Sequence, residues 1–360
     1  MGDGVSGVCV APATDAGVDA PEDSGPDSGP LGTCKRRVVF SDSARAPDGN
    51  LAPAEIWVAN VDGTGLTNLS NYPSADDNAP SWSPNGLRIA FVSNRTGRAN
   101  IFAINPDGTG LANLSTGAAS ADSSPVWSPD GTRIAFFRDD HVWVMNANGT
   151  GAAQVTELAA LQFAWSPSGT KLAFARYDAA TNFVPSVYVV TIGDGSAPLK
   201  LTSPASREGD VAWAPNSKIV FTNGVDIFAA DDDGANLLNI TKSTGLSRRT
   251  GDPLSVGASG LVAFDSDHGN GSELWTVPLD GGSVKPLVMV GRPNQESFMM
   301  SDVSDDGLLV AYRHDDQITD TTTIGVINID GTDAHIFGAP SGADAFGARF
   351  SPKCESRSGQ

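Results

Sequence analysis

Cysteine, histidine and positive charge are scarce in this sequence. Its 360 residues include 3 Cys and 4 His, and 23 Lys and Arg stand against 42 Asp and Glu, which gives a formal net charge of -19. A nucleic-acid-binding surface needs clustered Lys and Arg to replace the counterions around phosphates. The charge balance therefore argues against nucleic acid as a partner and favours a basic protein or peptide.

Long apolar runs and recognisable catalytic motifs are also missing. No stretch approaches the roughly 18 apolar residues that a membrane-spanning helix needs, so we expect no transmembrane segment. The chain lacks a G-x-S-x-G nucleophile elbow, which argues against a serine hydrolase. Its histidines form no H-x-x-x-H pair of the kind that places two metal ligands on one helical face.

Glycine and proline, in contrast, are abundant and spread along the chain. The sequence has 40 Gly and 23 Pro, together with 40% hydrophobic residues, which favours a core built from short strands joined by many turns. Residues 1–33 differ, because Gly, Pro, Ala, Ser and Asp dominate them and few apolar residues are present. We expect this segment to be a flexible acidic tether.

A short apolar strand that ends in an aromatic residue recurs seven times. Consecutive copies are 38 to 51 residues apart, close to the roughly 40 to 50 residues of a four-stranded propeller blade. The period predicts an all-β, seven-bladed propeller. The seven strands end at Phe40, Phe91, Phe136, Phe174, Phe221, Phe264 and Tyr312.

Each copy also carries the same turns. A first strand ends in a turn such as WSPNG at Trp82, and a third strand such as NIFAINPDG ends in Asp-Gly or Asn-Gly. Those dipeptides supply the positive φ angles of tight hairpins and lead into a fourth strand such as LANLS. Each copy is therefore predicted to form a four-stranded antiparallel sheet. All seven Trp fall at repeat positions, and we expect them to pack between blades.

The two ends of the chain are predicted to complete one blade. The first copy has no W-S-P strand of its own, and ARFSPKC near the C-terminus matches that strand without a blade to follow it. Alignment of the repeats puts Cys34 and Cys354 in the same turn, so we predict a disulfide that locks the ring there and leaves Cys9 unpaired. The predicted organisation is a tether at 1–33, a propeller at 34–354 and a short tail at 355–360.

The order of P-x-W-S-P-D-G, R-I-A-F, I-F or I-W, D-G-T-G and L-T or L-S resembles the PD40 (WD40-like) repeats of TolB-like propellers. The pattern is clearest at 82–115 and 124–156, and it weakens in LSVGASGLVAF and MMSDVSDDGLLVAY. The resemblance implies a periplasmic or extracellular protein that binds partners through one mouth of the ring. TolB itself looks like a six-bladed ring with an extra N-terminal domain, for which this chain has no room, so the resemblance does not name the partner.

The connections from each fourth strand to the next first strand open on one face of an antiparallel ring, and many are acidic. A ring of carboxylates there would attract cations or Lys- and Arg-rich partners. The alternative is that these loops are hydrated surface in a protein that is acidic throughout. The acidic residues are Asp76, Asp77, Asp122, Glu208, Asp210, Asp252, Glu296 and Asp344.

Long loops between second and third strands open on the same face, and binding sites concentrate on loops carried by rigid scaffolds. In the loop that follows Phe174, we expect Arg176, Tyr177 and Phe183 to be exposed anchors, because aromatic and Arg side chains dominate contact energies. The alternative is that this loop packs on itself.

Two further functions stay open, and both require a divalent cation. Some propellers of this repeat type are metal-dependent oligogalacturonate lyases with His and Gln ligands, and His268, His314 and Gln317 give a faint match to such a lyase or hydrolase site. A Ca²⁺-stabilised module is suggested by DSDHGNGSE after Phe264 and by DDDG at Asp231, although neither has the full EF-hand spacing.

The leading expectation is a non-catalytic, extracytoplasmic binding module that engages a protein or peptide through the loop-rich mouth, without a cofactor. We expect a monomer that is periplasmic or secreted. The tether makes the chain a lipoprotein candidate, although Cys9 lacks a visible lipobox.

Overall fold

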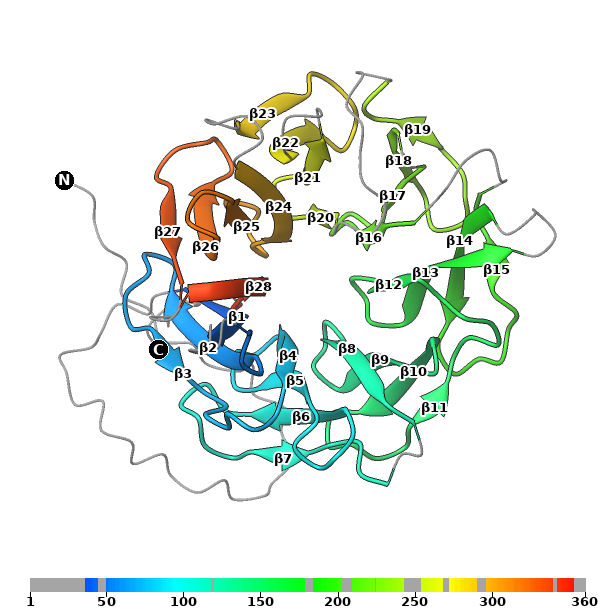
Figure 1. Ribbon diagram of the computed structural model, residues 1–360. Coiled ribbons are helices and arrows are strands. Elements are labelled where there is room, and N and C mark those ends of the chain that lie inside the picture. The colour runs from blue at the N-terminus through cyan, green and yellow to red at the C-terminus, as the bar shows by residue number, and fades with distance from the viewer. Residues whose placement is uncertain are drawn as a thin grey trace, which may run out of the picture.

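The computed structural model describes residues 36–44, 50–117, 120–178, 184–202, 209–223, 225–242, 254–267, 272–289, 296–338 and 342–352. These residues form seven four-stranded antiparallel sheets that stand as blades around a central axis (Figure 1). The described residues contain no helix, and hence none that could span a bilayer. The predicted all-β, seven-bladed propeller is confirmed.

Each blade has an inner strand next to the axis, followed outward by a second, a third and an outer strand (Figure 1). Blade 1 contains both ends of the chain, and blades 2 to 7 follow in sequence. From blade 1 to blade 7 the inner strands are β28 (Gly342–Phe350), β4 (Asp77–Trp82), β8 (Asp122–Trp127), β12 (Gln162–Trp165), β16 (Val211–Trp213), β20 (Ser255–Val256) and β24 (Glu296–Val303). The second strands are β1 (Arg37–Ala44), β5 (Ile89–Ser93), β9 (Arg133–Arg138), β13 (Lys171–Asp178), β17 (Ile219–Thr222), β21 (Leu261–Asp267) and β25 (Leu309–Asp316).

The outer half of each blade follows the same order. The third strands are β2 (Glu55–Asn60), β6 (Asn100–Ile104), β10 (His141–Asn146), β14 (Val184–Thr191), β18 (Ile227–Ala230), β22 (Ser272–Pro278) and β26 (Thr321–Asn328). The outer strands are β3 (Thr67–Asn68), β7 (Ala112–Asn113), β11 (Ala153–Gln154), β15 (Leu199–Lys200), β19 (Leu238–Asn239), β23 (Lys285–Val288) and β27 (His335–Phe337).

Antiparallel order gives the ring two different faces. One face, which we call the mouth face, carries the turns between second and third strands and the connections from each outer strand to the next inner strand. The opposite turn face carries the other two turns of each blade. Arg36 and Pro352, at the two ends of the described chain, lie on the turn face because β1 begins there and β28 ends there.

The repeated W-S-P motif forms the same turn in several blades. In blade 2, Ser83 Oγ accepts a hydrogen bond from the Arg88 N–H at 2.9 Å. Ser128 and Ser166 make the equivalent bond in blades 3 and 4, and Ser304 makes it in blade 7, where the sequence is V-S-D. The serine side chain therefore satisfies a backbone donor that the tight turn would otherwise leave unpaired.

In blades 1 to 5, a Ser or Thr just after the outer strand holds the third strand. In blade 1 the Ile56 N–H donates to Ser70 Oγ at 2.9 Å. The same bond joins Ile101 to Ser115, Val142 to Thr156, Val187 to Thr202 and Ile227 to Thr241. The outer strands of these five blades have only two residues each, so the side-chain bond extends their pairing.

Seven hydrophobic clusters fill the spaces between neighbouring blades. Trp82, Trp127 and Trp165 are buried in these clusters, and the other four Trp pack against them. Trp165 Nε1 also donates to the Val126 carbonyl of the preceding blade at 3.1 Å. The expectation that the Trp residues pack between blades is confirmed.

The two chain ends close the ring as predicted. Strand β28 pairs with β1, and Val38 lies opposite Phe350. At the end of this pairing the Arg37 N–H donates to Ser351 Oγ at 2.9 Å, and the Ser351 N–H donates to the Arg37 carbonyl at 2.8 Å. Cys34 and Cys354 lie outside the described residues, so the disulfide stays a prediction.

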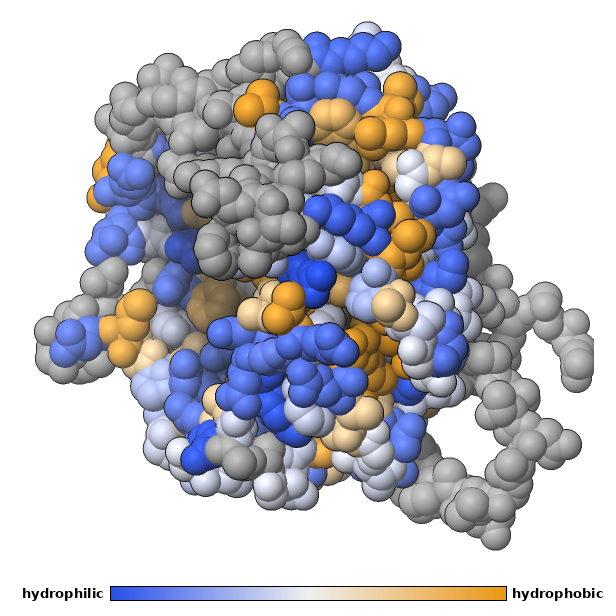
Figure 2. Space-filling view, turned by 90° about the vertical axis from the view of Figure 1, so that its right-hand side faces the viewer, coloured by the Kyte–Doolittle hydropathy of each residue, from blue (hydrophilic) through white to orange (hydrophobic). Residues whose placement is uncertain are grey.

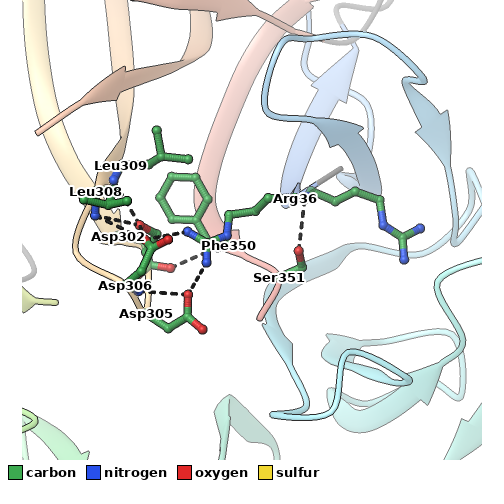
Figure 3. A network of polar contacts seen from close by, with 10 residues as sticks. Arg36, Asp302, Asp305, Asp306, Leu308, Leu309, Phe350 and Ser351 are labelled. Atoms are coloured by element: carbon green, nitrogen blue, oxygen red, sulfur yellow. Dashed lines mark hydrogen bonds and ion pairs between the residues drawn. The ribbon is translucent and has the colours of Figure 1, made fainter. Parts of the chain in front are cut away.

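An ion-pair network joins the closing blade to blade 7. Arg36 lies between the carboxylates of Asp305 and Asp306, which are in the turn after β24 (Figure 3). Arg36 Nη1 is 2.8 Å from Asp306 Oδ1, and only 9% of the Arg36 side chain is exposed. The start of β1 is therefore held to blade 7 as well as to its own inner strand.

Asp302 of β24 makes a second contact across this seam. Its Oδ2 accepts a hydrogen bond from the Phe350 N–H at 3.0 Å (Figure 3), and its Oδ1 lies 3.4 Å from the Ser255 hydroxyl of blade 6. Desolvation raises the pKa of the Asp302 carboxyl group above its usual value, and the charge of Arg349 opposes that rise.

Asp302→Asn should change how stability depends on pH. The folded state holds the Asp302 proton more tightly than the unfolded chain does, so this group favours folding below its unfolded-state pKa and loses that contribution as the pH rises through the folded-state pKa. Asparagine keeps a carbonyl acceptor for Phe350 without the charge. In thermal unfolding, the Tm of the variant should be higher than that of wild type at about pH 8, and the two Tm values should converge towards about pH 4. A Tm difference that stays constant over this pH range would contradict a raised pKa of Asp302.

Candidate functional site at the mouth face

The mouth face collects the predicted site residues that the structure describes. They are Asp76 directly before β4, Asp77 (β4), Asp122 (β8), Asp210 directly before β16, Glu296 (β24), Asp344 (β28), Arg176 and Tyr177 (β13), and His314 (β25), with Gln317 in the turn that follows. Phe183, Glu208, Asp252 and His268 lie outside the described residues. The described side chains differ in burial and in the groups that they contact, and these differences determine whether each can reach a partner.

Asp77 and Asp122 are buried, and each is paired with an arginine. Asp122 accepts hydrogen bonds from Arg138 Nε and Nη2 at 2.6 and 2.9 Å, and Asp77 accepts one from Arg95 Nη2 at 2.7 Å. Neither Asp side chain has any exposed area. Burial raises the pKa of Asp77, while the Ser93 hydroxyl and Arg95 act in the opposite direction. These two carboxylates are compensated within the fold and do not face an incoming partner.

Arg95 and Arg138 also cover aromatic rings between the blades. The guanidinium carbon of Arg138 is 4.9 Å from the Trp143 ring centre, and that of Arg95 is 5.2 Å from Phe102 and 4.9 Å from Tyr72. Cations at such distances are attracted by the ring face. Our sequence reasoning missed both arginines, although an Arg two or four residues after the repeated aromatic strand was a visible signal.

Arg176 holds the corresponding position in blade 4. Its guanidinium carbon lies 4.2 Å from the Tyr188 ring centre, so Arg176 is partly buried rather than fully exposed. The next residue, Tyr177, is 50% exposed. Of these two expected anchors, Tyr177 has the exposure that was predicted.

The remaining acidic residues differ in exposure. Asp344 Oδ1 lies 3.1 Å from Arg313 Nη2, and Arg313 Nε also donates to Asp315 at 2.7 Å. Asp210 is only 1% exposed. Asp76 is exposed, so a basic group of a partner could reach it directly.

The His314 side chain packs within its own blade, blade 7, rather than projecting from it. Its ring stacks on Phe298 with ring centres 4.8 Å apart, and its Nε2 is 3.9 Å from Glu296 Oε1. Gln317 is exposed in the turn after β25. Within the described ranges, no group of three or more His, Cys, Asp or Glu is arranged to hold a metal ion. The metal ligands stay a prediction that includes His268.

The inner strands of blades 1, 2 and 3 bend close to the mouth. Each contains a β-bulge, in which Gly347, Ala79 and Ser124 have φ angles of 66°, 52° and 50°. Positive φ is uncommon for residues other than glycine and stores local strain. The bend in β8 leaves Ser124 exposed and Val126 38% exposed on the innermost strand, which adds contact surface near the ring centre.

Exposed apolar side chains gather on the mouth face. Tyr72 and Tyr177 are the aromatic members of the exposed apolar residues that the structure describes, and both are on this face. Our sequence reasoning selected only Tyr177. Among the residues that the structure describes, those on this face are Leu51, Tyr72, Leu158, Leu161, Tyr177, Val225, Met289 and Ile318.

The outer rim of the ring has a different character. Figure 2 views it from the right-hand side of Figure 1, and apolar residues form separate small groups among hydrophilic ones on the coloured surface. Leu199 in β15 and Leu238 in β19 are exposed on outer strands. Scattered exposed apolar residues are normal on a protein surface, so they do not point to a binding site.

Comparison with known proteins gives matches among solved structures only. No protein-family model and no curated protein matches the chain. TolB from Acinetobacter baumannii is 17% identical with a TM-score of 0.57, over 88% of this chain and 67% of that one. The β-propeller domain of the Trilobed protease from Pyrococcus furiosus is 13% identical with a TM-score of 0.61, over 83% and 93%. The chain has a β-propeller fold.

An enzyme is among the similar structures too. An oligogalacturonate lyase in complex with manganese is 12% identical with a TM-score of 0.58, over 84% of this chain and 85% of that one. At such identities the likeness shows the fold alone. The assignment of PD40 repeats stays a prediction, and the comparisons do not choose between binding and catalysis.

Proposed function

We propose that the chain is a non-catalytic binding module outside the cytoplasm, which engages a protein or peptide through the mouth face. The observation that carries this proposal is the placement of Tyr72 and Tyr177, which are both exposed on the mouth face. Arg95 packs on the Tyr72 ring, and Tyr177 follows Arg176 in β13. Tyr and Arg are enriched among the residues that contribute most to binding energy, because they combine large apolar area with directed polar groups.

Tyr72 is held in place before any partner arrives. Its N–H donates to Glu55 Oε2 at 3.0 Å, and the same oxygen accepts a hydrogen bond from the Ser70 hydroxyl at 2.5 Å. The Arg95 guanidinium carbon lies 4.9 Å from its ring centre. A side chain fixed in this way loses less conformational entropy on binding, which strengthens the complex.

Exposed acids favour basic groups in the partner. Asp76, Asp139 and Asp140 are exposed on the mouth face, and the whole chain has a net charge of -19. A field of this sign accelerates encounter with Lys- and Arg-rich surfaces more than it adds to affinity. The predicted Cys34–Cys354 disulfide supports a periplasmic or extracellular location, because such bonds persist in oxidising compartments. Attachment of residues 1–33 to a membrane belongs to the same proposal.

No contact among the described residues favours the lyase alternative over a binding role. The described candidates, His314 and Gln317, belong to one strand and the turn after it. His314 is engaged with Phe298.

A peptide selection tests the binding proposal. Random twelve-residue peptides displayed on phage are selected on the immobilised 360-residue chain and then titrated against Tyr72→Ala/Tyr177→Ala. Binding should weaken by about tenfold or more, because loss of a hot-spot residue costs about 2 kcal/mol. Leu87→Ala/Leu308→Ala is the control, since these residues are 49% and 54% exposed on the turn face, and it should leave binding within about twofold. Failure to enrich peptides, or equal losses in both variants, would refute the proposal.

A further inference from the structure

Three consecutive blades place an arginine at, or just beyond, the mouth-face end of their second strand, and two of these arginines are neutralised. Arg95 in blade 2 and Arg138 in blade 3 pair with Asp77 and Asp122, the first residues of the neighbouring inner strands. The contact between Asp122 and Arg138 uses two parallel hydrogen bonds, which is the strongest geometry for a carboxylate and a guanidinium.

Blade 4 keeps the arginine and lacks the carboxylate. Its inner strand begins at Gln162, whose Oε1 already accepts the Val211 N–H at 2.8 Å, and the residue before it is Leu161. Among the described residues no carboxylate pairs with Arg176, and its buried Nε–H group has no hydrogen-bond partner. The Tyr188 ring, 4.2 Å from the guanidinium carbon, covers one side of the group.

An unmatched guanidinium at this position attracts an anion. The Arg176 side chain is partly exposed although its Nε atom is buried, so a partner carboxylate can approach the accessible part of the guanidinium and make charge-assisted hydrogen bonds there. We propose that Arg176 binds a carboxylate of the peptide or protein that the mouth face engages, an inference that rests on the proposed function. The carboxylate would neutralise the Arg176 charge, as Asp122 neutralises that of Arg138 in blade 3.

The neighbouring side chains define what accompanies the carboxylate. Leu158 and Leu161, in the connection that enters blade 4, are 51% and 40% exposed, and the Leu161 N–H donates to the carbonyl of Ala175, the residue before Arg176. They fit apolar residues on either side of the acid. The ligand is therefore an acidic residue flanked by apolar ones, or a chain terminus that follows an apolar residue. Basic groups elsewhere in the same partner would meet Asp76.

Three synthetic peptides with acetylated amino termini separate these sources. LFELF amide has a side-chain carboxylate, LFQLF acid has a terminal carboxylate, and LFQLF amide has neither. Each is titrated into the full chain while NMR follows the methyl groups of Leu158 and Leu161. We expect at least one acidic peptide to bind about tenfold more tightly than LFQLF amide, and the better of the two identifies the source of the carboxylate. Equal binding of all three would overturn the inference and leave peptide binding at the mouth intact.

Variants of the protein locate the effect. Arg176→Gln should abolish the preference for the acidic peptide, and Arg176→Lys should retain part of it, because lysine keeps the charge without the planar pair of donors. Arg98→Gln is the matched control: Arg98 is exposed in the turn between β5 and β6 and has the same charge. Should Arg176→Gln fail to fold, the peptide comparison on wild type still decides the question.

Four further outcomes count against the inference. A preference that survives Arg176→Gln, or that disappears equally with Arg98→Gln, would place the carboxylate elsewhere. Binding of trigalacturonate without binding of any of the three peptides would assign the site to sugar acids. If no probe binds at all, the carboxylate inference is wrong, while the phage selection decides the proposed function separately.

Discussion

Replacement of Cys34 and Cys354 by serine should lower the free energy of unfolding by about 4 kcal/mol or more. The predicted disulfide would close a loop that contains almost the whole ring, and the entropy that a crosslink removes from the unfolded chain grows with loop length. The residues three positions inside each cysteine, Arg37 and Ser351, are already joined by two hydrogen bonds of 2.9 and 2.8 Å. The bond would therefore reinforce a contact that the backbone makes.

Denaturant unfolding with and without reductant measures this effect. Wild type should lose stability on reduction, and Cys34→Ser/Cys354→Ser should be insensitive to reductant. Cys9→Ser is the matched control, because the same residue type is replaced in the tether, and it should behave like wild type. Non-reducing peptide mapping should find the two cysteines in one linked fragment. Equal stability of oxidised and reduced wild type would show that the disulfide does not hold the seam.

The sequence predicted the ring closely because each blade repeats a local chemical pattern. W-S-P, Asp-Gly and L-S motifs each correspond to a turn or a side-chain hydrogen bond within one blade, as Ser83 and Ser70 show. The closing strand could be assigned because it was the one copy missing from the count. Even the weak copy LSVGASGLVAF corresponds to the shortest inner strand, β20, which spans only Ser255–Val256.

The mouth could be predicted as a region but not as a set of contacts. Loop position placed Asp77 and Asp122 on the correct face, whereas their burial depends on arginines that reach them across the sheet. That pairing depends on the register of two strands, and a bulge in β8 shifts it by one residue. A residue count within the loop does not reveal the bulge, so the sequence could not distinguish a buried Asp122 from an exposed Asp76.

Asp122→Ala should be among the most damaging single changes at the mouth face. It would leave Arg138, whose side chain is only 14% exposed, without the carboxylate that binds it at 2.6 and 2.9 Å. Removal of one partner of a buried ion pair costs about 3 to 5 kcal/mol, because the remaining charge stays out of water. Denaturant unfolding would measure the loss, and a cost below about 1 kcal/mol would mean that the pair adds little to stability.

Three further variants separate the contribution of the Asp122–Arg138 pair from that of its surroundings. Asp122→Leu/Arg138→Met removes both charges and should recover most of the stability lost in Asp122→Ala, because an apolar pair has no desolvation cost. Arg176→Met removes the equivalent arginine from blade 4, where the described residues include no carboxylate partner, and should cost about 1 kcal/mol or less, chiefly the attraction to Tyr188. Arg138→Met alone should cost several times more, because it leaves Asp122 buried without its cation. The difference in unfolding free energy between Arg138→Met and Arg176→Met therefore measures how far the fold already engages each guanidinium. A small difference would mean that Arg176 is no more available to a ligand than Arg138.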